Sequence, residues 1–190
     1  MARSVLAKRF DTRASCRVRP TEGMEQNGLF MTDATEKSVI TTDNDAVIAE
    51  IHIAAPPERV FKALTDSAEL SRWFANPSCP VKLWEMDARP GGRYRYTEKG
   101  GVTVNGVNEF ECHGEILEFV PGRYLVYTWI ATWHADKSLQ TVVSWELTPE
   151  SRGTHVKVTH RGLAKEDAAR KDYSGGWVGV LEMLRKFVET

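Results

Sequence analysis

The final stretch of the chain, residues 173–190, constrains the fold more than any other part of the sequence. On a helical wheel of about 100° per residue, its apolar side chains share one broad arc and its charged side chains lie opposite. An arc of roughly 160° is wider than the seam of a coiled coil requires. We therefore expect a helix over 174–188 that lies against a curved surface. The apolar members of the arc are Trp177, Val180, Leu181, Met183, Leu184, Phe187 and Val188.

The ordered part upstream is expected to begin with a strand and two short helices. In AVIAEIHI, 46–53, apolar residues of one parity alternate with mixed residues of the other, which predicts a strand buried mainly on one face. A helix is expected within 54–66, because its two successive prolines suit a first helical turn, where no N–H is needed. A second helix is expected within 67–75, with Thr65 or Ser67 as its N-cap.

The middle of the chain alternates with a period of two and predicts six further strands. Strands that follow one another without intervening helices pair antiparallel. A twisted antiparallel sheet of about seven strands needs cover on one face, and the C-terminal helix is long enough to supply it. The sequence thus predicts an α+β fold, with two short helices after the first strand and a long C-terminal helix across the concave face of a curved sheet. The six strands are expected over 81–86, 93–96, 109–116, 124–133, 141–147 and 154–160, with further reversals at 99–101 and 105–106.

Residues 1–45 differ from the domain expected over 46–190. Their first half is rich in arginine and lysine, their second half is acidic and polar, and neither half is periodic. We expect a disordered tail. Two interpretations of the basic leader stay open: an organelle transit peptide, or an upstream extension before a later start at Met24 or Met31. We prefer the second.

Composition excludes several classes of protein. With 25 basic and 26 acidic residues the net charge is −1, which argues against a nucleic-acid partner. No apolar run approaches the roughly 18 residues of a membrane span. No nucleophile with its base, paired carboxylates, phosphate loop or metal cluster has useful spacing, so we expect no cofactor, metal or catalytic residue. The odd number of cysteines, without a CxxC pair, predicts free thiols in a cytoplasmic protein: Cys16, Cys79 and Cys112.

Several phrases of the sequence resemble one superfamily. They are IAAPPERVFKALTD (53–66), ELSRWF (69–74), PGGRYRY (90–96), GEILEFVPGRYLVYTW (114–129), VSWELTPESRGTHVKVTHRGL (143–163) and GGWVGVLEMLRKF (175–187). Together they resemble the START-like helix-grip superfamily, or SRPBCC, and within it the branch named for the activator of heat-shock protein 90 ATPase homologues. The resemblance covers 47–188. It implies a container fold whose members include lipid carriers, hormone receptors and polyketide cyclases, so it implies no particular ligand.

From these observations we expect a non-catalytic domain, monomeric or homodimeric, that binds a small apolar or aromatic molecule in a cavity between sheet and C-terminal helix. Two alternatives stay open. One is a polyketide cyclase or dehydratase-like enzyme that uses His160 or a tyrosine as acid–base group, and the other is a chaperone ATPase regulator or protein-interaction module. For most of the aromatic candidates, core packing is the competing interpretation. The candidate ligand-binding residues are Trp73, Phe74, Tyr94, Tyr96, Trp129, Trp145, His160, Trp177, Val180, Met183 and Phe187.

Overall fold

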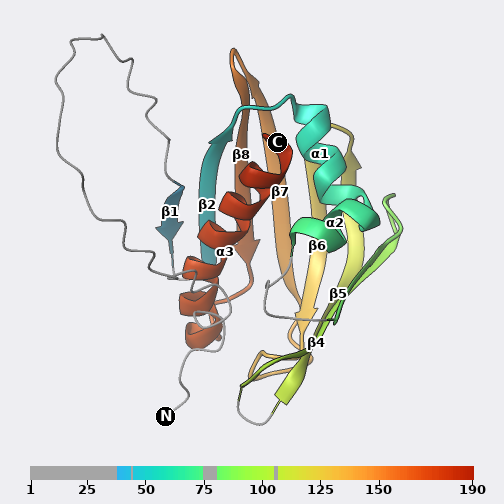
Figure 1. Ribbon diagram of the computed structural model, residues 1–190. Helices are drawn as coiled ribbons and strands as arrows, with labels where there is room; N and C mark the ends of the chain where they lie inside the picture. The colour runs from blue at the N-terminus through green and yellow to red at the C-terminus, as the bar shows by residue number, and fades with distance from the viewer. Residues whose placement is uncertain (1–37, 44, 75–80, 105–106) are drawn as a thin grey trace, which may run out of the picture.

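The computed structural model describes residues 38–43, 45–74, 81–104 and 107–190, without the side chains at 81–82, 100–104 and 107–108. One antiparallel sheet of eight strands, in the order β1-β2-β8-β7-β6-β5-β4-β3, carries three helices on one face (Figure 1). The strands are β1 (Val39–Thr42), β2 (Ala46–Ile53), β3 (Val81–Met86), β4 (Arg93–Val104), β5 (Val107–Val120), β6 (Tyr124–Ala131), β7 (Thr141–Glu150) and β8 (Gly153–Arg161). The helices are α1 (Pro57–Thr65), α2 (Ser67–Trp73) and α3 (Asp167–Val188).

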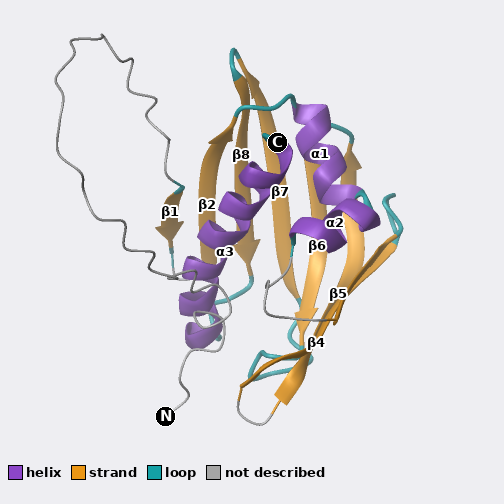
Figure 2. Ribbon diagram, viewed as in Figure 1, coloured by secondary structure: helices purple, strands orange, loops and turns teal. Residues whose placement is uncertain are grey.

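The predicted fold class is confirmed. The two short helices follow β2, and the long C-terminal helix crosses the same face of the curved sheet (Figure 2). The additional strand is β1, which lies inside the segment expected to be disordered and pairs with β2, Val39 opposite Glu50. All four residues of β1 are exposed, so the strand has no buried face that alternation in the sequence could reveal. The rest of the expected tail, 1–37, lies outside the described residues.

Helix α3 begins at Asp167, two turns earlier than expected from the apolar arc. The added turns carry mostly charged and small residues, which hide the periodicity, although Ala169 and Tyr173 are buried. Over 22 residues the helix is about 33 Å long at 1.5 Å per residue. The wheel itself is confirmed, because the members of its central stripe are 0–7% exposed: Trp177, Leu181, Leu184 and Val188.

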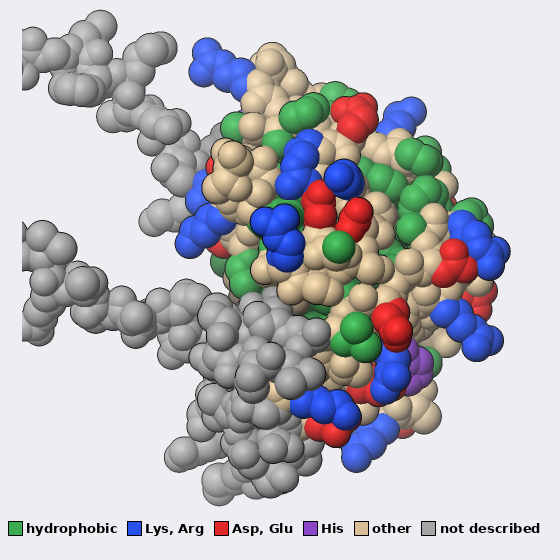
Figure 3. All heavy atoms as spheres, turned by 45° about the vertical axis from the view of Figure 1, so that its right-hand side comes forward, with side chains coloured by type: hydrophobic (Ala, Val, Ile, Leu, Met, Phe, Trp, Pro, Cys, Tyr) green, Lys and Arg blue, Asp and Glu red, His purple; other side chains and the backbone are tan. Residues whose placement is uncertain are grey.

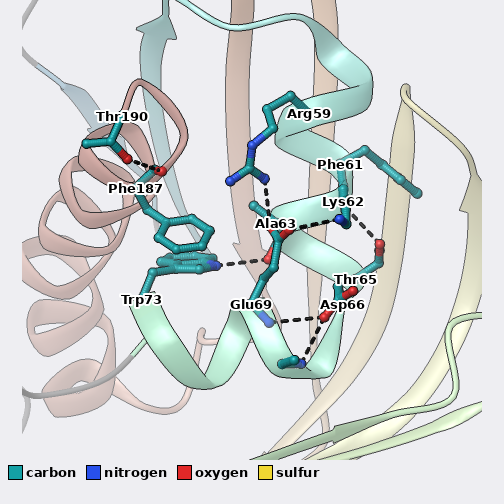
Figure 4. A network of polar contacts seen from close by, with 11 residues as sticks. Arg59, Phe61, Lys62, Ala63, Thr65, Asp66, Glu69, Trp73, Phe187 and Thr190 are labelled. Atoms are coloured by element: carbon teal, nitrogen blue, oxygen red, sulfur yellow. Dashed lines mark hydrogen bonds and ion pairs between the residues drawn. The ribbon is translucent and has the colours of Figure 1, made fainter.

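The cap of α2 differs from the prediction. Asp66, and neither Thr65 nor Ser67, accepts hydrogen bonds from the backbone N–H groups of Ala68 at 2.9 Å and Glu69 at 3.0 Å (Figure 4). The Asp66 carboxylate therefore accepts from two of the backbone N–H groups that every helix start leaves unpaired. Its negative charge also interacts favourably with the positive end of the helix dipole. Asp66 also ends α1, so a single residue separates the two helices.

The reversal predicted at 99–101 is wrong. Strand β4 continues to Val104, and its pairing with β5 shifts register between Lys99 and Val104. Glycines within a strand mark such irregularities as often as they mark turns. The turn predicted at 105–106 lies outside the described residues.

The concave face of the sheet follows the predicted alternation. On β8, Val156, Val158 and His160 are each 0% exposed, and on β5 Cys112 and Ile116 are buried while His113 and Glu115 between them are exposed. Large rings form much of this face, and the helices close over it to make one core. The polar atoms of these rings must find partners inside the protein.

Two glycines should respond oppositely to alanine. A Cβ at Gly114 would lie 2.0 Å from the carbonyl oxygen of Thr128 on the neighbouring strand, whereas one at Gly175 meets nothing within 4 Å. We expect Gly114→Ala to lower the free energy of unfolding by about 1–3 kcal/mol. Gly175→Ala, within α3, should raise it by up to about 1 kcal/mol. Urea denaturation measures both, and equal effects of the two substitutions would contradict this account of the β5–β6 contact.

Candidate functional site

The structure brings the predicted site residues together on the inner side of the fold. Nine of the eleven are buried, and Met183 and Phe187 are partly buried at the border of the same core. Their rings form two neighbouring groups, one beneath α2 and one beneath α3. Tyr127 joins the groups, because its ring centroid lies 4.9 Å from that of Tyr94 and 6.3 Å from that of Trp129.

The group beneath α2 centres on Phe74. Its ring meets those of Trp73, Trp84 and Tyr96 edge-on, with centroids 5.0–5.5 Å apart. The polar atoms of this group are engaged within the fold, since Trp73 donates to the Ala63 carbonyl at 2.9 Å. Tyr94 likewise donates to the Thr128 carbonyl at 2.8 Å. Burial holds the pKa of Tyr94 well above its ordinary value, so this hydroxyl stays protonated.

Phe187 ties the end of α3 to both short helices. The guanidinium carbons of Arg59 and Arg72 lie 5.1 and 5.2 Å from the centroid of its ring, within the range of cation–π attraction. Arg59 also forms an ion pair with Glu69 at 2.6 Å, and Phe187 lies beside Trp73 (Figure 4). This predicted ligand residue is therefore part of the contact between helices.

His160 uses both of its ring nitrogens. The Thr141 hydroxyl donates to the Trp129 carbonyl at 3.0 Å, so it accepts from Nε2 of His160 at 2.7 Å. Nδ1 of His160 accepts from the indole N–H of Trp177 at 3.3 Å. Burial holds the pKa of His160 well below its ordinary value, and the ring is neutral. The partners of both ring nitrogens are side chains of the fold, Thr141 and Trp177.

The hydroxyl of Tyr173 is the centre of the group beneath α3. It accepts from the indole N–H groups of Trp129 at 2.9 Å and Trp133 at 3.0 Å, and it lies 2.7 Å from Nε2 of His134. Two N–H donors occupy the two lone pairs of the oxygen, so its own proton points to His134. We call Trp129, Trp133, His134 and Tyr173 the tyrosine cluster.

His134 leaves one buried polar atom without a partner. The residue is 3% exposed, and within the described part of the chain its Nδ1 has no hydrogen-bond partner. Burial lowers the pKa of His134, and the nearby carboxylates of Glu166 and Asp136 oppose that shift without overcoming it. The imidazole is therefore neutral near pH 7.

Sequence reasoning missed His134, Tyr173 and Thr141. Tyr173 precedes Trp177 by four residues and so shares the apolar arc of α3, a signal that the wheel contained. His134 lies in an irregular loop after β6, where no periodicity indicates which way a side chain points. Thr141 begins a strand, and only its register against His160 gives it a role.

A groove of about 500 Å³ lies over the outer face of the sheet, where acidic and basic residues of β3, β4 and β5 alternate. Arg95 pairs with Glu111 at 2.7 Å across it. Figure 3 shows a similar mixture of acidic, basic and hydrophobic side chains on the face that it presents. Charges that compensate one another in this way select no single class of ligand, so the tyrosine cluster is the stronger candidate site.

An antiparallel sheet that grips a long C-terminal helix over an aromatic interior defines the helix-grip class. Residues 54–189 match the model of the Activator of Hsp90 ATPase homolog 1-like protein family, and the chain belongs to that family. No functionally curated protein matches it. Along the described residues, no helix has the length and hydropathy needed to cross a membrane, and no His, Cys, Asp and Glu side chains are grouped to hold a metal ion.

Solved structures share the fold. CV1439 from Chromobacterium violaceum is 26% identical, with 77% of this chain and 99% of that chain covered and a TM-score of 0.62. CalU16 from Micromonospora echinospora is 20% identical, with 80% and 85% covered and a TM-score of 0.57. DynU16, a protein of the dynemicin biosynthetic locus, is 20% identical, with 77% and 48% covered and a TM-score of 0.58. At these identities, the latter two show likeness of fold alone.

The two buried histidines predict how stability depends on pH. Both pKa values are lowered in the fold, so below about pH 6.5 the unfolded chain binds more protons and the free energy of unfolding falls. We expect His160→Asn to reduce the loss between about pH 7.5 and about pH 5 by up to about 2 kcal/mol, the limit set by the pKa of the unfolded chain. Urea denaturation across this range measures it, with the exposed His113→Asn as control. An unchanged slope in His160→Asn would show that the fold does not lower the pKa of His160.

Removing the Tyr173 hydroxyl should cost more than removing another buried hydroxyl. Tyr173→Phe removes the acceptor of two indole N–H groups and the hydroxyl bonded to His134, whereas Tyr127→Phe removes only the acceptor of the Trp145 N–H, now 2.9 Å from Tyr127. We expect losses of about 2–4 kcal/mol for Tyr173→Phe and about 1–2 kcal/mol for Tyr127→Phe in urea denaturation. Equal losses in the two variants would contradict the role of the Tyr173 hydroxyl as the common partner of three side chains.

Proposed function

We propose that this domain binds a small, flat, largely apolar molecule between the sheet and α3. The observation that carries the proposal is the continuous series of aromatic rings from Trp84, through Tyr94 and Tyr127, to Trp129 and Trp177. Because these rings contact one another in stacked, tilted or edge-on pairs, a guest must replace ring–ring contacts with ring–guest contacts. Flat molecules with aromatic faces meet that requirement best.

Two partly buried residues of α3 support the same proposal. Met183 and Phe187 are partly buried where the interior meets the surface, and Met86 lies at the border of the same core. Methionine has several rotatable bonds and adapts its shape to neighbouring groups. Met183 and Met86 can therefore move aside for a guest at a lower energetic cost than fully buried residues of α3 such as Leu181 and Leu184.

Catalysis by His160 is less well supported. An acid–base group needs a nitrogen that can reach the substrate, and both nitrogens of His160 already have partners, Thr141 and Trp177. The enzyme hypothesis would thus have to recruit another residue.

An interaction surface is also less well supported. Contiguous apolar patches mark protein-binding faces, whereas scattered apolar residues are ordinary. The exposed large hydrophobic side chains on the described residues are divided between β1, at one edge of the sheet, and β3 and β5, at or near the other: Val39, Ile40, Leu83, Leu117 and Val120.

Native mass spectrometry with fatty acids, sterols and polycyclic aromatic compounds tests the proposal. We expect a retained one-to-one complex with a polycyclic aromatic compound, and stabilisation of about 2.7 kcal/mol at a free concentration of about 100 times Kd. No retained molecule and no thermal shift with any of these compounds would refute ligand binding.

A matched pair of variants on α3 locates the site. Met183→Trp fills the partly buried flank and should weaken binding at least about tenfold. Lys186→Trp places the same side chain at an exposed position of the helix and should leave affinity unchanged. If Met183→Trp binds as tightly as the unmodified protein, the guest does not lie beside α3.

A further inference from the structure

The tyrosine cluster indicates the chemistry of the ligand as well as its shape. We propose that the ligand carries an uncharged carbonyl oxygen, as in an aromatic ketone, quinone or ester, and that this oxygen accepts a hydrogen bond from Nδ1 of His134. The inference rests on the function proposed above and specifies which group of the guest meets the protein. The ligand class is a flat, apolar carbonyl compound.

The first step is the position of the proton on His134. The Tyr173 oxygen accepts two indole N–H groups, so its hydroxyl proton goes to Nε2 of His134, 2.7 Å away. A neutral imidazole carries one proton, and with Nε2 acting as acceptor that proton must be on Nδ1. His134 therefore presents a fixed hydrogen-bond donor.

The second step is that other ring donors of the interior are already used. The indole N–H groups of all six tryptophans donate to protein acceptors, and Nε2 of His160 donates to Thr141. Among the residues that the structure describes, Nδ1 of His134 has no acceptor, although its atom is buried. A buried donor left unpaired is costly, so an acceptor brought by a guest removes that cost.

The third step concerns the charge of the acceptor. Glu166 is 7% exposed and accepts the backbone N–H of Asp136 at 3.2 Å. The carboxylates of these two residues influence the pKa of His134, so their negative charge reaches the imidazole. A carboxylate on the ligand would be repelled there, whereas a neutral carbonyl would not.

The rings around His134 supply the matching shape. Trp129 and Trp133 stand nearly perpendicular, with centroids 6.0 Å apart and planes at 76°. Trp133 is partly exposed, and His134 follows it directly, held by a hydrogen bond from its backbone N–H to the Ala131 carbonyl at 3.2 Å. A flat ring that lies along one indole thus presents its edge, with any carbonyl on it, to His134.

Three probes of similar size and different polarity test the inference: fluorenone, fluorene and fluorene carboxylate. In the full-length protein we expect fluorenone to bind about tenfold more tightly than fluorene, since one neutral hydrogen bond in a buried site is worth about that factor. Fluorene carboxylate should bind least well. Isothermal titration or quenching of tryptophan fluorescence gives the three values of Kd.

Two variants of His134 distinguish the roles of its two ring nitrogens. In His134→Gln the amide reaches the place of Nε2 and can still accept from Tyr173, but the donor at Nδ1 is lost. We expect this variant to lose the preference for fluorenone over fluorene. In His134→Asn the amide lies near the place of Nδ1, and part of the preference should return.

An NMR spectrum of the unmodified protein gives a test that does not depend on whether a variant folds. With ¹⁵N-labelled histidine, the Nδ1 proton of His134 should be visible and should shift downfield with fluorenone but not with fluorene. Equal affinity for fluorenone and fluorene overturns the carbonyl inference, and so does a preference for fluorenone that persists in His134→Gln. Either result leaves the proposed function standing. If none of the three probes binds, ligand binding and the inference fail together.

Discussion

The structure depends on finding partners for polar atoms that aromatic side chains carry into the core. Tyrosine, tryptophan and histidine bury large apolar faces, but each brings an N–H or O–H whose burial is costly unless it is bonded. In this domain the partners come mostly from other rings, as in the pair Trp177 and His160, at 3.3 Å. The helix and the sheet are thus joined by directional bonds in addition to apolar contact, which fixes their relative position more sharply than packing alone.

This mode of assembly distinguishes residues that maintain the fold from those that are available to a guest. His160, the candidate that sequence alternation placed in the interior, is engaged on both sides and oriented by Thr141 and Trp177. His134 has only its Nε2 bonded, to Tyr173. Two histidines of similar burial therefore have different chemical capacities, and the difference arises from their partners rather than from their exposure.

The sequence predicted what depends on periodicity and missed what depends on contacts between distant segments. The alternation Val156, Val158, His160 and the stripe from Trp177 to Val188 correctly gave the buried faces of β8 and α3. The hydrogen bond between His134 and Tyr173 joins residues 39 positions apart in the chain, and no local pattern encodes it. The edge strand β1 was missed for a related reason, since a strand without a buried face leaves no hydrophobic period.

Helix α3 is held near both ends by contacts of individual side chains, in addition to its buried stripe. Near its start, Tyr173 bonds to His134 and to two indoles of the sheet and the following loop. Near its end, Phe187 lies within 5.2 Å of the guanidinium carbons of Arg59 and Arg72. Met183, between these attachments, is only partly buried. A guest that entered beside Met183, as proposed above, would displace a flexible side chain and leave both attachments intact.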